Sequence, residues 1–307
     1  MNRRVFLGST FAATTTLWAK GNKIDMSRVS VLTDEVANSP ADAIAFAKQY
    51  GLKWVELRGV PGGKGGSYAF LEPDKLKAAQ QEFRDAGLRV SFLNTGMLKF
   101  DLPGTEPARK RQNETPEAKA KREANAQTRF DNRIEDLHKA IRAAHAFDVN
   151  LVRVFTFSRV AEPETLFPRI ADVIGEMALI AEKEGVKLLI ENEGSCNVCL
   201  SSELRDLCKM IPSRAVGINW DPVNELGKPV APFPNGYALL PKERVLNVQM
   251  KARALVIGPD FVDWKGVFAA LEKDGYKGKV GLETHVFDGT LIEKAHLCME
   301  KIKEIVA

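Results

Sequence analysis

Eight short apolar segments recur along this chain, separated by helix-like stretches, and this alternation restricts the fold more than any other feature. The apolar segments span residues 28–33, 53–58, 89–94, 151–157, 187–192, 215–221, 245–251 and 279–285. They are rich in Val, Ile, Leu and Phe, as strands buried on both faces are. We therefore expect a parallel sheet that is covered by helices.

The stretches between the strands carry helix start and stop signals. Ser39 and Pro40 form a typical helix beginning, and Gly51 follows the predicted end of that helix. One long helix is expected over 115–147, and another closes the chain. Since no linker divides the eight strand–helix units, the sequence predicts a single (β/α)8 TIM barrel over residues 26–307.

An open doubly wound sheet is the competing α/β fold, and it normally has a glycine-rich phosphate loop after its first strand. The only glycine cluster, GGKGGS at 62–67, follows the second strand instead. It has neither the ending of a P-loop nor the G-x-G-x-x-G spacing of a dinucleotide site. We interpret it as a mobile loop over the mouth of the barrel.

Residues 1–25 differ in character from the rest of the chain. Arg3 and Arg4 precede a Phe-Leu pair and then a small, weakly apolar run, an order that resembles a twin-arginine export signal. The chain is then expected in the periplasm, or in the cytoplasm if these residues are not a signal. Leu17 stands where a cleavage site favours a small residue, so the segment could also remain attached as an anchor.

The charge balance argues against a nucleic-acid partner. Lys and Arg together number 44 and Asp and Glu 40, which leaves a formal charge of only +4. The most basic stretch, 108–129, is interpreted as the solvated face of a helix. No segment after the signal has the ~18 apolar residues that a membrane span needs. Cys196 and Cys199 are close enough to pair after export, and otherwise the cysteines are expected to be structural thiols.

Each of the last four predicted strands ends on a side chain with an oxygen ligand: Glu191, Asp221, Gln249 and Glu283. In a TIM barrel all strands end on the same face. Three carboxylates that meet there repel one another unless a cation lies between them. An all-oxygen set suits Mn²⁺ or Mg²⁺, with positions left for water or substrate. These four residues are the candidate metal ligands.

At these strand ends the chain resembles the sugar phosphate isomerase/epimerase superfamily, the xylose isomerase-like barrels. The motifs that carry the resemblance are IENEGSC, GINWDPVNE, NVQMK and GYKGKVGLETH. Two positions depart from the family pattern. Gln249 stands where His is usual, which weakens one ligand, and Ala252 stands where Asp is common.

The resemblance implies that a divalent ion, most simply Mn²⁺ with Mg²⁺, Co²⁺ or Zn²⁺ as alternatives, holds two adjacent oxygens of a carbohydrate substrate. The ion polarises a carbonyl and stabilises the enediolate that forms when the neighbouring carbon loses its proton. Glu191 and Glu283 are the residues expected to move that proton. His285 is a candidate acid for a leaving group or a hydrogen-bonding residue.

Further polar residues lie near the same strand ends and are candidate substrate-binding groups. They are Glu56, Arg58, Asn94, Arg153, Glu193, Asn224 and Lys251. Lys251 follows Gln249 by two residues, so the alternation of a strand puts both on one side. The sequence leaves open whether Arg153 points into the barrel.

Several functions remain to be separated. The first is a metal-dependent isomerase or epimerase of a keto-sugar, with a lyase or dehydratase acting on a 3-keto-glycoside as its alternative. An AP endonuclease shares the barrel, but it needs a histidine-rich zinc cluster and a basic surface, and this chain has only 4 histidines. A barrel that binds sugar without catalysis is also conceivable because of Gln249. The chain could form a homo-oligomer.

Overall fold

The computed structural model describes residues 23–63, 66–257 and 262–307 of the 307-residue chain. Residues 1–22 of the predicted export signal and residues 64–65 of the glycine cluster therefore lie outside the described part. Among the described residues, Ile24 is the first that is buried, with 1% of its surface exposed. Its backbone N–H donates a hydrogen bond of 2.6 Å to Glu272 Oε1.

Eight parallel strands close into one barrel, in which each strand pairs with the next and β1 pairs with β8. The strands are β1 (Val29–Leu32), β2 (Trp54–Leu57), β3 (Arg89–Leu93), β4 (Leu151–Val154), β5 (Lys187–Glu191), β6 (Val216–Trp220), β7 (Val245–Lys251) and β8 (Lys279–Glu283). Every predicted strand is present. The prediction of a single TIM barrel is confirmed.

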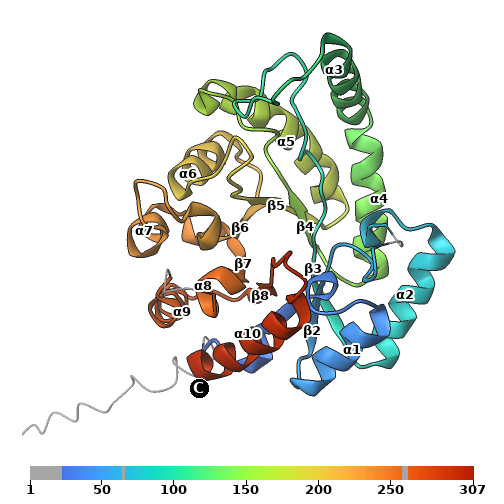
Figure 1. Ribbon diagram of the computed structural model, residues 1–307, viewed down its shortest axis with the longest axis vertical. Coiled ribbons are helices and arrows are strands. Elements are labelled where there is room, and N and C mark those ends of the chain that lie inside the picture. The colour runs from blue at the N-terminus through green and yellow to red at the C-terminus, as the bar shows by residue number, and fades with distance from the viewer. Residues whose placement is uncertain (1–22, 64–65, 258–261) are drawn as a thin grey trace, which may run out of the picture.

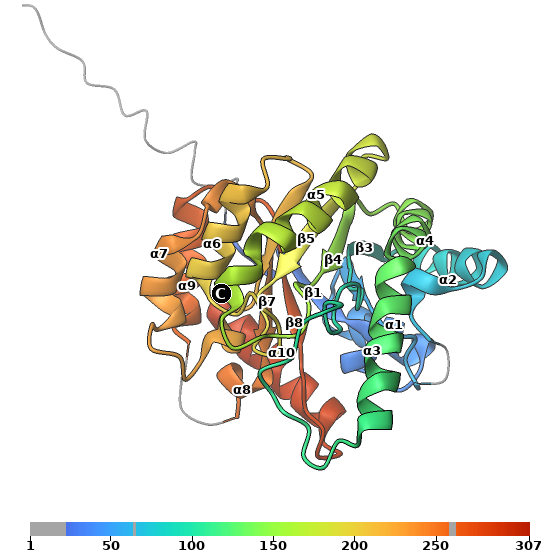
Figure 2. The same ribbon diagram turned by 90° about the horizontal axis from the view of Figure 1, so that it is seen from above.

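Helices surround the strands on all sides (Figures 1 and 2). They are α1 (Pro40–Gln49), α2 (Pro73–Asp85), α3 (Pro116–Asp131), α4 (Arg133–Ala146), α5 (Phe167–Lys183), α6 (Ser201–Met210), α7 (Tyr237–Leu239), α8 (Ala252–Leu255), α9 (Trp264–Lys273) and α10 (Leu291–Val306). The predicted start of α1 is confirmed, because Ser39 Oγ accepts a hydrogen bond of 3.1 Å from the N–H of Asp42. Gly51 ends it with a φ of +64°, a value that glycine adopts without strain. No helix in the described ranges is long and apolar enough to cross a membrane.

The single long helix predicted over 115–147 is wrong, because the chain forms α3 and α4 with a break at Asn132. Asp131 and Asn132 are weak helix formers, since their side chains compete for backbone hydrogen bonds. Thr128 also bonds back to the carbonyl of Ala124 at 3.0 Å, a contact that often bends helices. Only Ala126 of α3 is buried, so α3 extends from the barrel while α4 packs against it.

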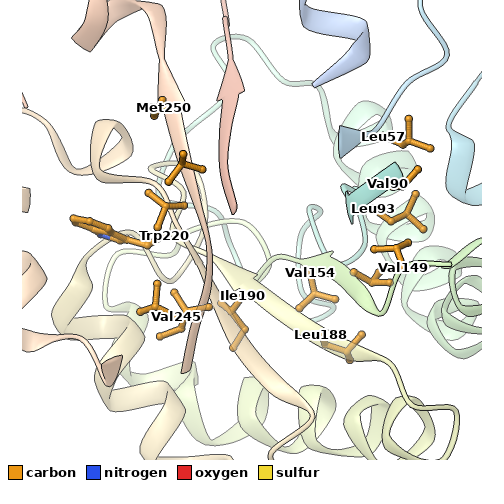
Figure 3. Close-up of a cluster of buried hydrophobic side chains, with 14 of the residues drawn as sticks. Leu57, Val90, Leu93, Val149, Val154, Leu188, Ile190, Trp220, Val245 and Met250 are labelled. Atoms are coloured by element: carbon orange, nitrogen blue, oxygen red, sulfur yellow. The ribbon is translucent and has the colours of Figure 1, made fainter. Parts of the chain in front are cut away.

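Many apolar strand side chains point outward, and most of the buried polar ones point inward. Figure 3 shows Leu57, Ile190, Trp220 and Met250, which belong to the apolar layer between strands and helices. Their strand neighbours face the opposite way because side chains alternate along a strand. The polar strand residues buried in this manner include Ser30, Glu56, Arg153, Glu191, Asn219, Asn247, Gln249 and Lys251. The centre of the barrel is therefore polar toward the ends of the strands.

The four cysteines are free and buried in this structure. Cys196 and Cys199, whose pairing the sequence left open, are two separate thiols. Burial raises the pKa of Cys196 to about 12 and that of Cys199 to about 11, so both are protonated at neutral pH. The interpretation of these cysteines as packing residues agrees with this arrangement.

Candidate metal and catalytic site

Three buried carboxylates meet where β5, β6 and β8 end. Glu191, Asp221 and Glu283 each offer an oxygen, and these oxygens all lie within 4.8 Å of one another. None of the three residues is more than 4% exposed. The sequence predicts that these residues meet at the end of the barrel where the strands finish, and the structure brings them together there.

Within the described part of the chain, Gln249 Oε1 accepts no hydrogen bond, and Asp221 Oδ2 and Glu283 Oε2 have only the ammonium group of Lys251 beside them. Buried polar atoms normally find a partner, so such orphans call for an explanation. A divalent cation is the simplest partner for a set of carboxylate and amide oxygens. The residues present therefore fit a divalent metal ion.

The ammonium group of Lys251 lies among the candidate ligands rather than at the outer rim. Its Nζ is 2.7 Å from Asp221 Oδ2 and 3.5 Å from Glu283 Oε2. It also donates to Asn224 Oδ1 at 2.8 Å. Lys251 thus supplies one positive charge beside the point where the three carboxylates meet.

Two arginines complete the network of ion pairs. Arg153 points into the barrel and donates to Glu191 Oε2 at 2.9 Å. Arg58 contacts Asp34, Glu35 and Glu283 at 2.9, 2.5 and 2.9 Å. The ion pairs of Arg58, Arg153 and Lys251 join five carboxylates to three cations. When all five carboxylates are ionised, the formal excess is two negative charges, which equals the charge of one divalent ion.

The environment shifts the pKa values of Asp221 and Glu283 in opposite directions. Burial raises the pKa of Asp221 to about 7. The positive charge of Lys251 opposes this rise, and the negative charges of Glu191 and Glu283 add to it. Burial alone would raise the pKa of Glu283 as well, but Lys251 and Arg58 lower it to about 2. Glu283 is therefore held ionised by two cations, whereas Asp221 has only one.

Gln249 is oriented by Glu56 from the opposite side of the barrel. Its Nε2 donates to Glu56 Oε2 at 2.6 Å, which leaves Oε1 as the free oxygen. Glu56 was predicted to bind substrate, but all its hydrogen bonds go to neutral donors inside the barrel: Ser30, Asn94, Asn247 and Gln249. A Cβ at Gly281 would lie 2.0 Å from Glu56 Oε1, so β8 needs a glycine there.

Sequence reasoning missed two residues that hold the ligands in place. Asn219 Nδ2 donates to Glu191 Oε2 at 2.6 Å, and Asn247 Nδ2 donates to Asn219 Oδ1 at 3.0 Å. Asn219 precedes Asp221 by two residues and Asn247 precedes Gln249 by two. The same alternation that placed Lys251 could therefore have found both.

Asp34 and Glu35 were also missed, although they directly follow the first predicted strand. They lie in a short 3₁₀ turn (Thr33–Glu35) and hold Arg58 from one side. Glu35 Oε2 also accepts a hydrogen bond from the backbone of His285. The polar end of β1 was the available signal.

His285 lies at the edge of the site with 46% of its side chain exposed. Its Nδ1 is 3.7 Å from Glu283 Oε1 and 3.9 Å from Glu35 Oε1. The other histidines lie on helices: His138 and His145 on α4 and His296 on α10. Within the described residues, His285 is the only histidine in a cluster of possible metal ligands.

Three other predicted residues surround the site. Asn94 donates to Glu56 at 3.0 Å and so belongs to the barrel interior. Asn224 donates to the carbonyl of Asn192 at 2.8 Å while its Oδ1 accepts from Lys251. Glu193 pairs with Lys99 at 3.0 Å. Burial raises the pKa of Glu193, but Lys99 and Lys251 outweigh it and the pKa is lowered overall.

The comparisons with known proteins agree with this architecture. The family model described as "Xylose isomerase-like TIM barrel" matches residues 44–302. Among curated proteins, no sequence matches this chain.

Solved structures share the fold at low identity. A xylose isomerase-like TIM barrel protein from Mycobacterium smegmatis in complex with magnesium is 14% identical, with a TM-score of 0.64, over 92% of this chain and 98% of that one. A 3-keto-D-glucoside 4-epimerase from E. coli is 12% identical, with a TM-score of 0.62, over 91% and 98%. A D-psicose 3-epimerase from Clostridium cellulolyticum H10 with D-tagatose is 13% identical, with a TM-score of 0.62, over 91% and 96%.

Proposed function

Because this chain belongs to the xylose isomerase-like TIM barrel family, we propose that it is a metal-dependent sugar isomerase or epimerase that acts on a keto-sugar or related carbohydrate. One observation carries the proposal: the oxygens of three buried carboxylates lie within 4.8 Å of one another in a network of five carboxylates and only three cations. Such an arrangement is unfavourable for stability alone, since each unpaired buried charge costs free energy.

Glu191, Asp221, Gln249 and Glu283 would hold the divalent ion. We propose Mn²⁺, with Mg²⁺, Co²⁺ and Zn²⁺ as alternatives. When bound, such an ion supplies Lewis-acid polarisation of a carbonyl oxygen. Glu56 fixes the amide of Gln249 so that an oxygen, and not a nitrogen, is free, which is the role that partners of metal ligands commonly have.

Glu191 and Glu283 are the carboxylates proposed to move the proton on the carbon next to that carbonyl. Arg153 and Asn219 both bind Glu191 through Oε2, which leaves Oε1 without a hydrogen bond within the described residues. Arg58 binds Glu283 through Oε1. Each carboxylate is thus held on one oxygen, and a fixed orientation is what efficient proton transfer requires.

The alternative of a lyase or dehydratase on a 3-keto-glycoside rests on His285. Elimination requires an acid close to the leaving oxygen, and His285 is a half-exposed imidazole 3.7 Å from Glu283. Simple proton relocation does not need it. The similarity in fold to epimerases of D-psicose and of a 3-keto-glucoside leads us to favour epimerisation.

The test is solvent exchange. The protein is incubated with Mn²⁺ in D₂O and a panel that contains D-fructose, D-psicose, D-tagatose and a 3-keto-glucoside, and the products are followed by NMR. We expect deuterium at the carbon next to the carbonyl together with a new epimer, and no reaction in EDTA. A product that has lost its leaving group supports the lyase instead. Sugar binding with no bound metal and no exchange supports the non-catalytic barrel.

We also propose that residues 1–25 export the protein to the periplasm by the twin-arginine pathway. The order of Arg3, Arg4 and the following Phe-Leu pair supports this proposal. The test is to replace Arg3 and Arg4 by Lys and to compare periplasmic and cytoplasmic fractions. We expect the double variant to stay in the cytoplasm, and an unchanged distribution would contradict the proposal.

A further inference from the structure

A polar groove opens on the face of the barrel that carries the candidate site. It has a volume of about 880 Å³, within the range of about 300–1,000 Å³ that small-molecule sites occupy. Its walls are the loops that follow β3, β4 and β5, which contribute residues 107–112, Ser158 and Arg159, and Gly194 and Ser195. The groove is thus part of the catalytic face and not of the helical exterior.

Backbone hydrogen bonds join the three loops and give the groove a fixed frame. The N–H of Ala108 donates to the carbonyl of Arg159 at 2.8 Å, and the N–H of Arg159 donates to the carbonyl of Ser195 at 2.8 Å. The loop after β3 is also tied to α3, because Arg122 binds Asp101 at 2.6 Å and Glu114 at 2.8 Å. Residues 109–111 lie between these two attachments.

The charges of the groove are unequal. Arg159 is paired with Glu203 at 2.7 Å, and Asp101 is paired with Arg122. Arg109, Lys110 and Arg111 are exposed, and none of them has an ion pair within the described part of the chain. Three adjacent cations therefore line the groove with no ion pair among the described residues, and Glu114 is the carboxylate whose charge is felt by one of them, Arg111. The interpretation of residues 108–129 as one solvated helix face does not hold for this part, which lies before α3.

The groove begins beside the candidate site. Ser195, one of its lining residues, donates through N–H and Oγ to Glu193 Oε1, both at 3.3 Å. Glu193 follows Glu191 by two residues and pairs with Lys99 at 3.0 Å. A molecule that reacts at Glu191 and extends past Glu193 would enter the groove at Gly194 and Ser195.

We propose that this groove binds an acidic group on the distal part of the substrate, so that the substrate is an acidic glycoside or oligosaccharide larger than one sugar ring. This proposal rests on the proposed function of the site. A nucleic acid fits less well, because it needs a long series of phosphate contacts. The neighbouring cations on α3 extend the series little, since Lys119 and Arg122 are paired with Glu106, Asp101 and Glu114, and Lys121 alone between them has no ion pair among the described residues.

The test compares the binding of two disaccharides of equal size. Cellobiose is neutral, and cellobiouronate carries a carboxylate on its non-reducing ring. Isothermal titration calorimetry of the full chain with Mn²⁺ should show that cellobiouronate binds about tenfold more tightly at about 50 mM NaCl, with the preference reduced at about 500 mM. Inorganic phosphate serves as a probe of anion binding alone, and we expect it to compete only weakly.

A triple variant tests whether the three cations of the groove cause the preference for cellobiouronate. Replacement of Arg109, Lys110 and Arg111 by Gln should remove the preference for cellobiouronate and leave cellobiose binding unchanged. The matched control replaces three exposed cations of α2, Lys75, Lys77 and Arg84, by Gln, which changes the net charge equally. We expect the control to keep the preference.

Other outcomes overturn the proposal. Equal binding of the two disaccharides, loss of the preference in the control variant, or phosphate binding as tight as that of cellobiouronate would each show that the groove does not recognise an acidic sugar. Binding is measured without turnover. If no deuterium exchange occurs but the preference for cellobiouronate is retained, the proposed reaction is refuted while the proposed binding of an acidic ligand still holds.

Discussion

Glu56 and Glu283 are both buried glutamates inside the same barrel, yet their surroundings differ completely. Glu56 is 0% exposed and receives hydrogen bonds only from neutral groups. Glu283 is 4% exposed and lies between Arg58 and Lys251, with Oε2 free of hydrogen bonds. Burial raises the pKa of Glu56, whereas the two cations lower that of Glu283.

The difference separates a supporting role from a chemical one. Both oxygens of Glu56 are occupied by protein donors, so this carboxylate can act only through the residues that it orients. Glu283 keeps one oxygen available and is held ionised, which is what a metal ligand or proton acceptor requires. The same substitution, Glu to Gln, therefore gives a matched pair of variants.

The largest effect is expected for Glu283→Gln. An amide cannot accept the proton, so exchange of solvent deuterium into the substrate should fall by about 10³-fold or more, even with saturating Mn²⁺. Because the pKa of Glu283 is lowered in the folded protein, its ionised form stabilises the fold above pH ~4.5. The variant should therefore also melt earlier at neutral pH. Exchange at the wild-type rate would show that Glu283 is not the base.

Lys251→Met should have the next largest effect, in this case on stability. It removes the cation nearest to Asp221 and Glu283, and unpaired buried charges cost about 3–5 kcal/mol. We expect this loss in the free energy of unfolding in EDTA, measured by urea titration. Mn²⁺ should recover more stability in the variant than in the wild type, because the ion then replaces a lost charge. An identical gain in both proteins would argue that the metal lies elsewhere.

Asp221→Asn tests the opposite pKa shift. A raised pKa means that the stability contributed by Asp221 is present below pH ~4 and is lost as pH rises through about 7. Without metal, the variant should therefore be more stable than the wild type by about 2–4 kcal/mol at pH 8, and nearly equal to it at pH 4. Denaturant titrations in EDTA at the two pH values measure this. A variant less stable at pH 8 would contradict the shift.

Glu56→Gln should have the smallest effect and completes the comparison. Gln249 loses the charged acceptor that orients its amide, so the affinity for Mn²⁺ should fall by about 10–100-fold. Exchange activity should return when Mn²⁺ is saturating, in contrast to Glu283→Gln. Calorimetric metal titration and the exchange assay separate the two variants. Activity that saturating metal does not restore would place Glu56 in the chemical step.

The fold followed from the sequence because its signals were local and repeated. Eight apolar runs, with Gly and Ser-Pro at the helix ends, predict the strands, the helices and their order along the chain without any knowledge of tertiary contacts. The break at Asn132 was missed because helical periodicity continues through it. The hydrogen bond from the Thr128 side chain to the carbonyl of Ala124, and the weak helix propensity of Asp131 and Asn132, act there instead.

The candidate site followed only in part. Strand ends predicted that Glu191, Asp221 and Glu283 would meet, since parallel strands share one carboxyl edge. The pairing of Lys251 with Asp221, and of Glu56 with Gln249, depends on which strands face each other across the barrel. That relationship is set by closure and stagger, and no local pattern encodes it. The polar groove lined by Arg109, Lys110 and Arg111 could not be predicted from the sequence for the same reason, because three separate loops form it.

The packing of Ile24 against the barrel has a practical consequence. Ile24 is tied to Glu272, and the Lys23 side chain donates to the carbonyl of Ala307 at 3.4 Å, so the first described residues and the C-terminus meet beneath the strands. The carboxylates lie at the other end, where the strands finish. A carrier, an affinity tag or a lipid anchor that replaces the residues before 23 would therefore be attached at the end of the barrel opposite the carboxylates. The end of the barrel that carries the carboxylates would then remain accessible to ligands.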